Sequence, residues 1–356
     1  MTESRLAVHT CGWDIGGAHL KFAALSADKT LLAAEQLCCP LWQDLAHLEQ
    51  AIGVLNKKYA LASARHAVTM TGELCDNFKN REEGVRAIVQ TLNRELPSQN
   101  YRLYSQGGGW IDPHHCVPNT SLIASANWNA SAQLVSRHLD TAIVVDIGST
   151  TTDVICVQNG SVQTRGHDDF NRLKNAELVY TGLVRTPVAA IVSDLPFDDE
   201  NIPVVAETFA TTADVYRILD CLHEDADLYP SADDGPKTRE GSARRLFRMI
   251  GRDYSGEFDQ ACRMAERIRT TQLERIGMAI NKHVDARYPS TVDLNLVGMG
   301  CGEALVGLLA EEFGLVYRSF ASLVQISERA EINDSLLKAN VCGPAVAVAF
   351  ELAGLE

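Results

Sequence analysis

Two copies of one short motif carry residues that could bind phosphate. The first reads Asp14-Ile-Gly-Gly-Ala18 and the second reads Asp146-Ile-Gly-Ser-Thr-Thr151. Glycine has no Cβ, so the backbone NH groups of such turns can approach phosphate oxygens closely, and the second turn adds hydroxyl groups. The predicted phosphate-binding residues are Gly16, Gly17, Ala18, Lys21, Gly148, Ser149, Thr150 and Thr151.

The carboxylates that open the two motifs could bind a divalent cation. Carboxylates hold Mg²⁺ directly or through its waters, while phosphates complete the coordination shell. We therefore predict Asp14 and Asp146 as Mg²⁺ ligands. Lys21 either reaches a phosphate oxygen as a point charge or faces solvent. Asp153 is either a further metal contact or an ordinary strand carboxylate.

A third glycine-rich turn, Gly298-Met-Gly-Cys-Gly302, stands between a predicted strand and a predicted helix. This arrangement suits close approach by a nucleotide or another flat ligand, so Gly298, Met299 and Gly300 are candidate ligand-binding residues. A tight structural turn is the alternative. Cys301 lacks the Gly-x-Ser-x-Gly spacing and an evident Asp-His pair, which argues against a nucleophile.

The elements that must position these turns form one pattern twice. Strands are expected on both sides of each Asp-Ile-Gly turn, which makes a hairpin at the start of each half. The first hairpin is followed by a strand over 31–36, a helix over 42–59, a strand over 67–70, a helix over 82–92, a strand over 101–104 and a helix over 121–138. The second is followed by a turn at Asn159-Gly160, a strand over 161–165, a helix over 257–282, a strand over 292–297 and helices over 303–311 and 335–352.

This pattern predicts an α/β fold with two lobes of β-β-β-α-β-α-β order. The first lobe is expected over residues 1–138, and a C-terminal helix at about 335–356 could pack on it. The second lobe is expected over 139–334, with a helical insertion at about 168–250.

Length and charge limit the functions open to the chain. A length of 356 residues favours two domains, and a net charge of -14 opposes binding to nucleic acid or an anionic membrane. Ten cysteines without a secretory start or a Cys-x-x-Cys pair indicate reduced thiols and a cytoplasmic protein. The most apolar stretch, residues 341–350, is too short to cross a bilayer.

Several motifs resemble those of hydantoinase/oxoprolinase-related proteins in the actin, Hsp70 and sugar-kinase superfamily. They cover Gly12–Lys21, Val68–Leu74, Asp146–Asp153, Glu177–Gly182, Arg185–Val188 and Phe209–Tyr216. Within that family they are similar to the tetrahydromethanopterin-linked one-carbon transfer group, whose archaeal members include the synthase that forms the ether link of methanofuran. The resemblance implies two actin-like, ribonuclease H-like lobes with a central cleft. His19 departs from the Asn expected in relatives.

The resemblance also implies a Mg²⁺-dependent transferase of methanofuran or methylofuran biosynthesis. Such an enzyme joins an aminomethylfuran-methyl diphosphate to the phenol oxygen of a tyramine or tyrosine derivative and releases pyrophosphate. The candidate catalytic residues are then Asp153 or Glu177 as the proton acceptor and Lys21 beside the diphosphate.

Three other functions stay open on the sequence. They are an ATP-dependent small-molecule kinase, an ATP-hydrolysing enzyme like the larger hydantoinases and oxoprolinases, and a non-catalytic nucleotide sensor or scaffold. The sequence does not determine the phenolic acceptor, whether ATP binds, or whether the chain forms a homo-oligomer.

Overall fold

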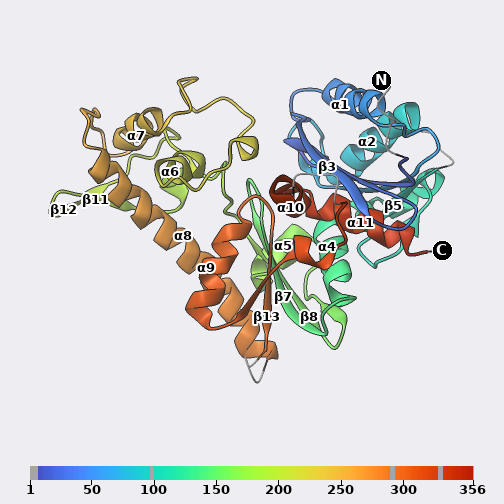
Figure 1. The fold of residues 1–356 in the computed structure, drawn as a ribbon. Coiled ribbons are helices and arrows are strands. Elements are labelled where there is room, and N and C mark those ends of the chain that lie inside the picture. The colour runs from blue at the N-terminus through green and yellow to red at the C-terminus, as the bar shows by residue number, and fades with distance from the viewer. Residues whose placement is uncertain (1–6, 97–99, 289–292, 328–331, 356) are drawn as a thin grey trace. The chain divides into compact units, whose positions relative to one another are not determined.

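The computed structural model describes residues 7–96, 100–288, 293–327 and 332–355 (Figure 1). The chain divides into two compact units. Unit 1 contains Met1–Val144, Ile155–Asp168 and Arg318–Glu356, and unit 2 contains Val145–Val154 and Asp169–Tyr317. This division passes through strands of the second sheet, and the lobe boundary expected at residues 138 and 139 stays a prediction.

The first sheet has the strand order β3-β2-β1-β4-β5-β6. Its strands are β1 (Thr10–Ile15), β2 (His19–Leu25), β3 (Leu31–Cys38), β4 (Arg65–Met70), β5 (Tyr101–Tyr104) and β6 (Trp110–Ile111), and its first helices are α1 (Ala46–Lys58) and α2 (Arg81–Glu95). β1 pairs antiparallel with β2 and parallel with β4, which in turn pairs parallel with β5. The predicted β-β-β-α-β-α-β order is confirmed here.

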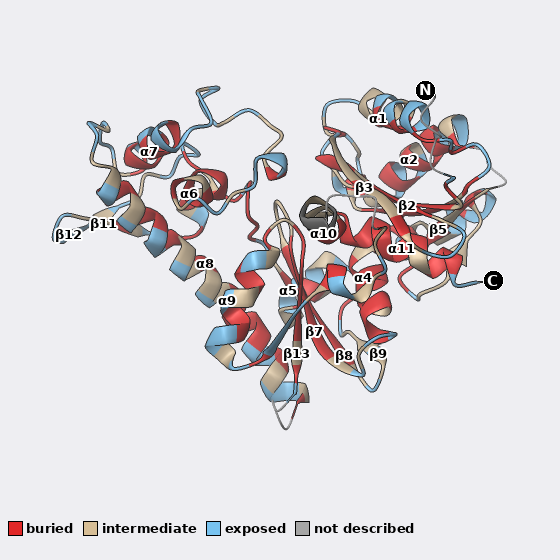
Figure 2. Cartoon of the chain, viewed as in Figure 1, coloured by how far each residue is buried: buried red, intermediate tan, exposed pale blue. Residues whose placement is uncertain are grey.

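Helix α11 (Gly343–Ala353) packs on the first sheet and is largely buried (Figure 2). A Cβ at Gly12 of β1 would lie 1.8 Å from the Ala345 carbonyl oxygen, so the close approach of the helix requires glycine. Elsewhere in this core, the fully buried ring of Trp13 packs edge-on against Phe22 at 4.8 Å between ring centroids. The Trp13 Nε1 donates to His66 Nδ1 at 3.1 Å. Burial lowers the pKa of His66 to about 4.

The second sheet has the order β10-β8-β7-β13-β14, and β9 also pairs with β8. Its elements are β7 (Thr141–Ile147), β8 (Thr152–Gln158), β9 (Ser161–Gln163), α5 (Asp169–Asn175), β10 (Leu178–Val179), β13 (Asn295–Met299), α9 (Glu303–Phe313) and β14 (Val316–Ser319). The φ angles of Asn159 and Gly160 are 54° and 64°, as a two-residue hairpin turn requires. The predicted turn between β8 and β9 is therefore confirmed.

Unit 2 also contains a largely helical insertion. It comprises β11 (Asp194–Phe197), β12 (Glu200–Pro203), α6 (Thr212–Ile218) and α7 (Arg239–Arg248), and the long helix α8 (Phe258–Arg287) follows (Figure 1). Thr211 and Asp214 form a capping box at the start of α6, which is the capping role considered for Thr211 from the sequence. Asp214 also accepts from the buried Arg245 at 2.8 Å, so α6 and α7 are tied together.

Two long helices expected from the sequence are each interrupted. The predicted helix over 121–138 is α3 (Thr120–Ile123) and α4 (Asn127–Ser136), because Ser125 between them has a φ of 50°. The predicted helix over 335–352 is α10 (Ile332–Val341) and α11, which are separated at Cys342. The helical spacing of apolar residues continues through such single-residue breaks, so the spacing does not reveal them. Both predictions of one continuous helix were therefore wrong in this detail. The start of the strand predicted over 292–297 lies outside the described residues.

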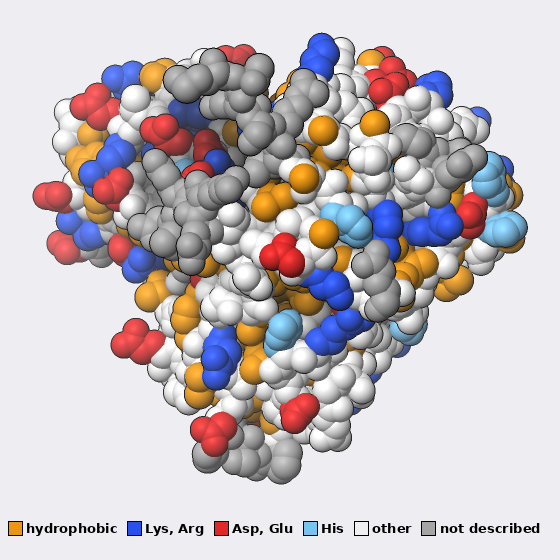
Figure 3. Space-filling model, turned by 45° about the vertical axis from the view of Figure 1, so that its right-hand side comes forward, with side chains coloured by type: hydrophobic (Ala, Val, Ile, Leu, Met, Phe, Trp, Pro, Cys, Tyr) orange, Lys and Arg blue, Asp and Glu red, His pale blue; other side chains and the backbone are white. Residues whose placement is uncertain are grey.

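Short 3₁₀ helices complete the secondary structure. They are η1 (Gly72–Leu74), η2 (Pro113–His115), η3 (Val117–Asn119), η4 (Val188–Ala190), η5 (Glu224–Ala226) and η6 (Phe320–Leu323). In the part of the chain that is described, no helix combines the length and apolar character needed for a membrane span. Acidic and basic side chains are both distributed over the surface seen in Figure 3.

Candidate functional site

The first Asp-Ile-Gly turn is closed by its own backbone. Gly16 N donates to His19 O at 2.9 Å, and Leu41 N donates to Gly17 O at 2.9 Å. Cys39 N donates to Ala18 O at 3.0 Å. The NH and C=O of a trans peptide point in opposite directions. With the Gly17 carbonyl directed at Leu41, the amide NH of Ala18 therefore points the other way.

The second turn repeats this geometry. Gly148 N donates to Thr151 O at 2.9 Å, which corresponds to the Gly16 to His19 bond of the first turn. Leu183 N donates to Gly148 O at 2.9 Å, and Arg185 N donates to Ser149 O at 2.8 Å. The repeat seen in the sequence is thus a repeat of backbone structure.

A glycine from outside each turn packs directly against it. A Cβ at Gly182 would lie 2.5 Å from Thr150 N and 2.6 Å from Ser149 C, so only glycine fits beside the second turn. A Cβ at Gly72 would lie 3.1 Å from Ile15 O and 3.2 Å from Gly16 O. Both glycines occur in the family motifs, but their contact with the turns depends on folding between distant segments.

A buried network fixes the segment that contains Gly182. Thr152 Oγ1 donates to Thr181 O at 2.7 Å, and Gln272 Nε2 donates to Thr181 Oγ1 at 2.8 Å and to Gly182 O at 2.9 Å. Tyr216 donates through its hydroxyl group to Gln272 Oε1 at 2.7 Å. Gln272 was not identified from the sequence. The one feature that could have indicated it is the presence of a polar residue on the buried face of the helix predicted over 257–282.

Lys21 and Asp14 lie together in unit 1. They are directly opposed in the β1–β2 pair, and Lys21 Nζ is 3.9 Å from Asp14 Oδ2. The Asp14 side chain is 4% exposed and that of Lys21 is 19% exposed, so the lysine is the more accessible group. Both residues thus lie beside the first turn, where the sequence predicted a lysine for a phosphate and a carboxylate for Mg²⁺.

In unit 2, the third glycine turn lies against Asp146. A Cβ at Gly300 would lie 2.3 Å from Asp146 Oδ1 and 2.3 Å from Ile147 O, and the φ of Gly300 is 82°. Gly302 N donates to Ile147 O at 2.9 Å. The structure therefore brings the predicted Gly298, Met299 and Gly300 turn beside a predicted metal ligand.

Both candidate proton acceptors have arginine partners. Arg172 Nη1 donates to Asp153 Oδ1 at 2.7 Å, and Arg172 Nη2 donates to the Glu177 carbonyl oxygen at 2.9 Å. The Glu177 carboxylate lies 3.8 Å from Arg287 and is 3% exposed, whereas the Asp153 carboxylate is 13% exposed. Arg172 was not identified from the sequence, because nothing local indicates that α5 returns its side chain to β8.

The described carboxylates do not form a closed metal site. Among the residues described, no group of three or more His, Cys, Asp or Glu side chains is arranged to hold a metal ion. Mg²⁺ is commonly bound by one or two carboxylates, with waters and substrate phosphates in the other positions. Asp14 lies in unit 1 and Asp146 in unit 2, each largely buried, and their role as Mg²⁺ ligands stays a prediction.

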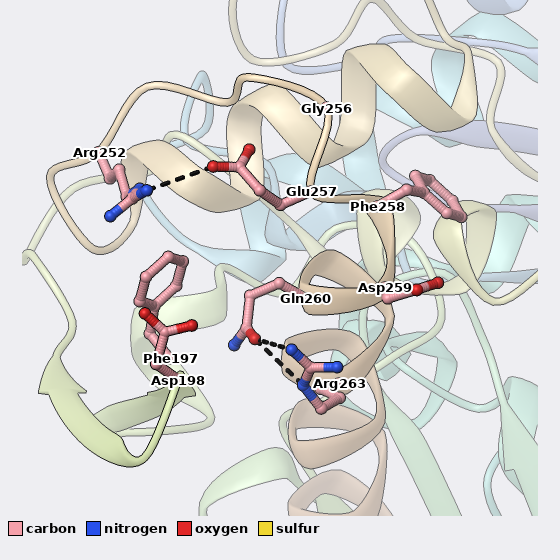
Figure 4. Close-up of a pocket in the computed structure, with 9 residues that line it drawn as sticks. All are labelled: Phe197, Asp198, Arg252, Gly256, Glu257, Phe258, Asp259, Gln260 and Arg263. Atoms are coloured by element: carbon pink, nitrogen blue, oxygen red, sulfur yellow. Dashed lines mark hydrogen bonds and ion pairs between the residues drawn. The ribbon is translucent and has the colours of Figure 1, made fainter.

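A pocket of about 420 Å³ is lined by residues of the insertion and of the start of α8, and none of the predicted site residues lines it. Figure 4 shows two interactions among its lining residues: Arg252 donates to Glu257 at 3.2 Å, and Arg263 Nε donates to Gln260 at 3.1 Å. Arg252 also stacks on Phe197, 4.4 Å from the ring centroid. These contacts stabilise the insertion and are separate from the glycine turns.

The repeated hairpins and sheet orders define an α/β fold of the actin-like ATPase and sugar-kinase class. The family model described as hydantoinase/oxoprolinase matches residues 65–323. The chain belongs to this hydantoinase/oxoprolinase family, as the sequence motifs predicted.

Two archaeal proteins and one solved structure are similar to this chain. The protein from Methanocaldococcus jannaschii called (4-{4-[2-(gamma-L-glutamylamino)ethyl]phenoxymethyl}furan-2-yl)methanamine synthase is 29% identical over 308 residues, which cover 86% of this chain and 89% of that protein. The synthase of the same name from Methanococcus vannielii is 34% identical over 125 residues, covering 35% of this chain and 56% of that protein. A nucleotide-free acetone carboxylase structure has a TM-score of 0.52 at 9% identity, covering 86% of this chain and 67% of that one, and shows likeness of fold alone.

Proposed function

We propose that this chain forms the ether bond of a methanofuran- or methylofuran-type cofactor, within tetrahydromethanopterin-linked one-carbon metabolism in the cytoplasm. The substrates would be an aminomethylfuran-methyl diphosphate and a phenol of the tyramine or tyrosine class. The observation that carries the proposal is similarity over 86% of the chain to a synthase whose name specifies a phenoxymethylfuran product. The glycines of the two turns support it, because a residue without a Cβ permits the close backbone approach that a diphosphate leaving group needs.

The reaction exchanges one C–O bond for another. The bond between the furanylmethyl carbon and the diphosphate breaks, and its electron pair leaves with pyrophosphate. The furan ring delocalises the positive charge that develops on the carbon. The phenol oxygen then bonds to that carbon and loses its proton. Donors held in fixed positions around the departing charge lower the barrier without reorganising during the reaction.

Within this proposal the diphosphate lies against the turn residues Gly16, Gly17, Ala18 and Gly148 and the hydroxyl-bearing residues Ser149, Thr150 and Thr151. The amides of Gly16 and Gly148 close their own turns, so these two glycines serve by permitting close approach of the backbone. Lys21 adds a positive charge. Mg²⁺ held by Asp14 and Asp146 would neutralise charge on the leaving group. Asp153 and Glu177 are the proposed proton acceptors. Asp153 is the better placed of these, because its carboxylate is the more exposed.

The test is an ATP-free assay of the purified chain with the furan diphosphate, a phenolic acceptor and Mg²⁺. We expect pyrophosphate and the ether product in equal amounts, measured enzymatically and by mass spectrometry. Asp14→Asn should abolish product while the protein stays folded, and Asp253→Asn, in an exposed loop, should behave as wild type. Failure of the wild-type chain to make ether from any phenol of this class would overturn the proposal.

An ATP-dependent small-molecule kinase is the second candidate. The observation that favours it is the glycine turn at Gly298–Gly300 lying against Asp146, an arrangement suited to a nucleotide with a bound cation. ADP formation that requires a small acceptor, with no pyrophosphate released, would establish this function in place of the first.

A further inference from the structure

Two threonines at the end of β4, Thr69 and Thr71, have no role in the function proposed so far. They belong to the motif Val68–Leu74. β4 pairs parallel with β1, so both strands have their carboxyl ends at one edge of the sheet, and the first turn follows β1 at that edge. In open α/β sheets, ligands bind outside the carboxyl ends of the strands. The two threonines therefore stand at the edge where a ligand of the first turn would bind.

The side chain of Thr71 lies against the first turn. Thr71 N donates to Ile15 O at 2.9 Å, which holds the end of β4 beside the end of β1. A Cβ at Gly16 would lie 3.7 Å from Thr71 Oγ1, which is ordinary van der Waals contact. Thr71 is half-buried, so its hydroxyl group is both beside the turn and accessible.

This hydroxyl group is available as a donor. Thr71 is the N-cap residue of η1, a position at which threonine ordinarily accepts a hydrogen bond from the helix that follows. Its side chain makes no such bond, and within the described chain its hydrogen bonds come from its backbone N and O. The hydroxyl group is therefore not used to stabilise η1.

Thr69 presents a second hydroxyl group on the same face of β4, because side chains two residues apart in a strand point to the same side. It is in register with Asp14 of β1, so these two side chains also share a face. Thr69 is fully buried, yet its Oγ1 has no hydrogen-bond partner among the described residues. A buried hydroxyl group without a partner is costly and rare in native proteins, so it points to a ligand.

The second half of the repeat shows a threonine whose role is structural. Gly182 packs on the second turn as Gly72 packs on the first, and a threonine precedes each glycine. The second of these, Thr181, is completely buried and accepts from Gln272 Nε2 at 2.8 Å. The hydroxyl group beside the second turn is thus bonded within the protein, whereas that of Thr71 is not.

The two turns also differ in the side chains they contain. The second turn has Ser149 and Thr150 where the first has Gly17 and Ala18. A hydroxyl group donates one hydrogen bond and can direct it at a phosphate oxygen. The first turn lacks such donors at these positions, and the neighbouring strand supplies them beside it.

We propose that the hydroxyl groups of Thr69 and Thr71 complete the first turn as a binding site for the diphosphate. Thr71, the more accessible of the two, donates to a phosphate oxygen, and Thr69 adds a donor beside Asp14. The assignment rests on the proposed function and adds two binding residues that were not identified from the sequence.

Titration calorimetry with inorganic pyrophosphate and Mg²⁺ measures the contribution of Thr71. Thr71→Val removes the hydroxyl group and keeps a branched side chain of similar size. Its affinity for pyrophosphate should fall about tenfold or more, since hydrogen bonds to charged groups have that magnitude. Thr71→Ser keeps the donor and should retain most of the affinity. In the ether assay, Thr71→Val should raise the KM for the furan diphosphate and leave the KM for the phenol unchanged.

Thr69→Val should change stability and binding in opposite directions. The substitution replaces a buried hydroxyl group that has no partner by a methyl group, so the urea midpoint of the ligand-free chain should rise. The affinity for pyrophosphate should fall, because the ligand loses a donor. A threonine with a structural role only would leave this affinity unchanged.

Two other threonines provide matched controls. Thr181→Val should lower the urea midpoint, because Gln272 Nε2 loses one of its two acceptors. Thr271→Val, on α8, should bind pyrophosphate as the wild type does, because the Thr271 hydroxyl group donates to Arg267 O within its own helix.

Wild-type affinity for pyrophosphate in both Thr69→Val and Thr71→Val would overturn the inference, and so would a wild-type chain that does not bind pyrophosphate. An equal loss in Thr71→Ser and Thr71→Val would also contradict it, because the hydroxyl group would then not be the cause. If the wild-type chain binds pyrophosphate but makes no ether, the proposed function fails by itself, and the titrations still decide the role of the two hydroxyl groups.

Discussion

Gly300 and Gly314 form a matched pair for measuring how strongly the third glycine turn depends on its packing. Both have left-handed backbone angles, with φ of 82° and 64°. A Cβ at Gly300 would lie 2.3 Å from Asp146 Oδ1, whereas a Cβ at Gly314 would meet nothing within 4 Å. Alanine therefore introduces the same kind of backbone strain at both positions and a steric clash only at Gly300.

The expected losses in stability follow from these two terms. Left-handed backbone costs a non-glycine residue about 1–2 kcal/mol, and overpacking adds about 1–3 kcal/mol. Gly314→Ala should therefore lower the free energy of unfolding by about 1–2 kcal/mol, and Gly300→Ala by about 2–5 kcal/mol. Gly300→Ala should also reduce ether formation strongly, because the new methyl group displaces the Asp146 carboxylate. Gly314→Ala should leave turnover unchanged.

Urea unfolding followed by fluorescence gives the stabilities, and pyrophosphate release over a range of Mg²⁺ concentrations gives the activity. Equal destabilisation by the two substitutions would refute the steric argument. Full activity of a folded Gly300→Ala protein would show that the position of Asp146 does not matter to the chemistry.

Three further substitutions test separate contacts. Asp146→Ala should leave the chain folded and remove Mg²⁺-dependent turnover, as checked by circular dichroism and product assay, and unchanged turnover would exclude the metal role. Gly12→Ala should destabilise the chain by several kcal/mol in thermal or urea unfolding, because its Cβ would lie 1.8 Å from Ala345 O; a change below about 1 kcal/mol would contradict that packing. Asp153→Asn should lower stability by about 3–5 kcal/mol, because it leaves the buried Arg172 without its carboxylate, and wild-type stability would show that this ion pair contributes nothing.

The hairpins and their turns could be predicted because their determinants are local. An apolar strand, an Asp-Ile-Gly turn and a second strand follow one another directly at Asp14 and again at Asp146. Backbone hydrogen bonds close both turns within four residues, so a short window of sequence contains the information. The Asn159-Gly160 turn was predictable for the same reason.

What supports the turns could not be predicted, because it depends on contacts between distant segments. Gln272 reaches Thr181 from a helix about ninety residues away in the chain, and α11 reaches Gly12 from the opposite end. A polar residue in a helix or a glycine in a strand has many ordinary explanations. Only the folded structure shows that these positions lack space or need a hydrogen-bond partner.

The internal repeat also shows how the two halves differ in the residues of each turn and of the strand that follows it. Lys21 and Asp153 occupy the same place, seven residues after the aspartate that opens each motif. In the first half the residue is a cation beside Asp14, whereas in the second half it is an anion whose charge is offset by Arg172. The second turn has hydroxyl-bearing residues where the first has glycine and alanine. The backbone of the turn is thus repeated, while the side chains around it have diverged in charge and in hydrogen-bonding groups.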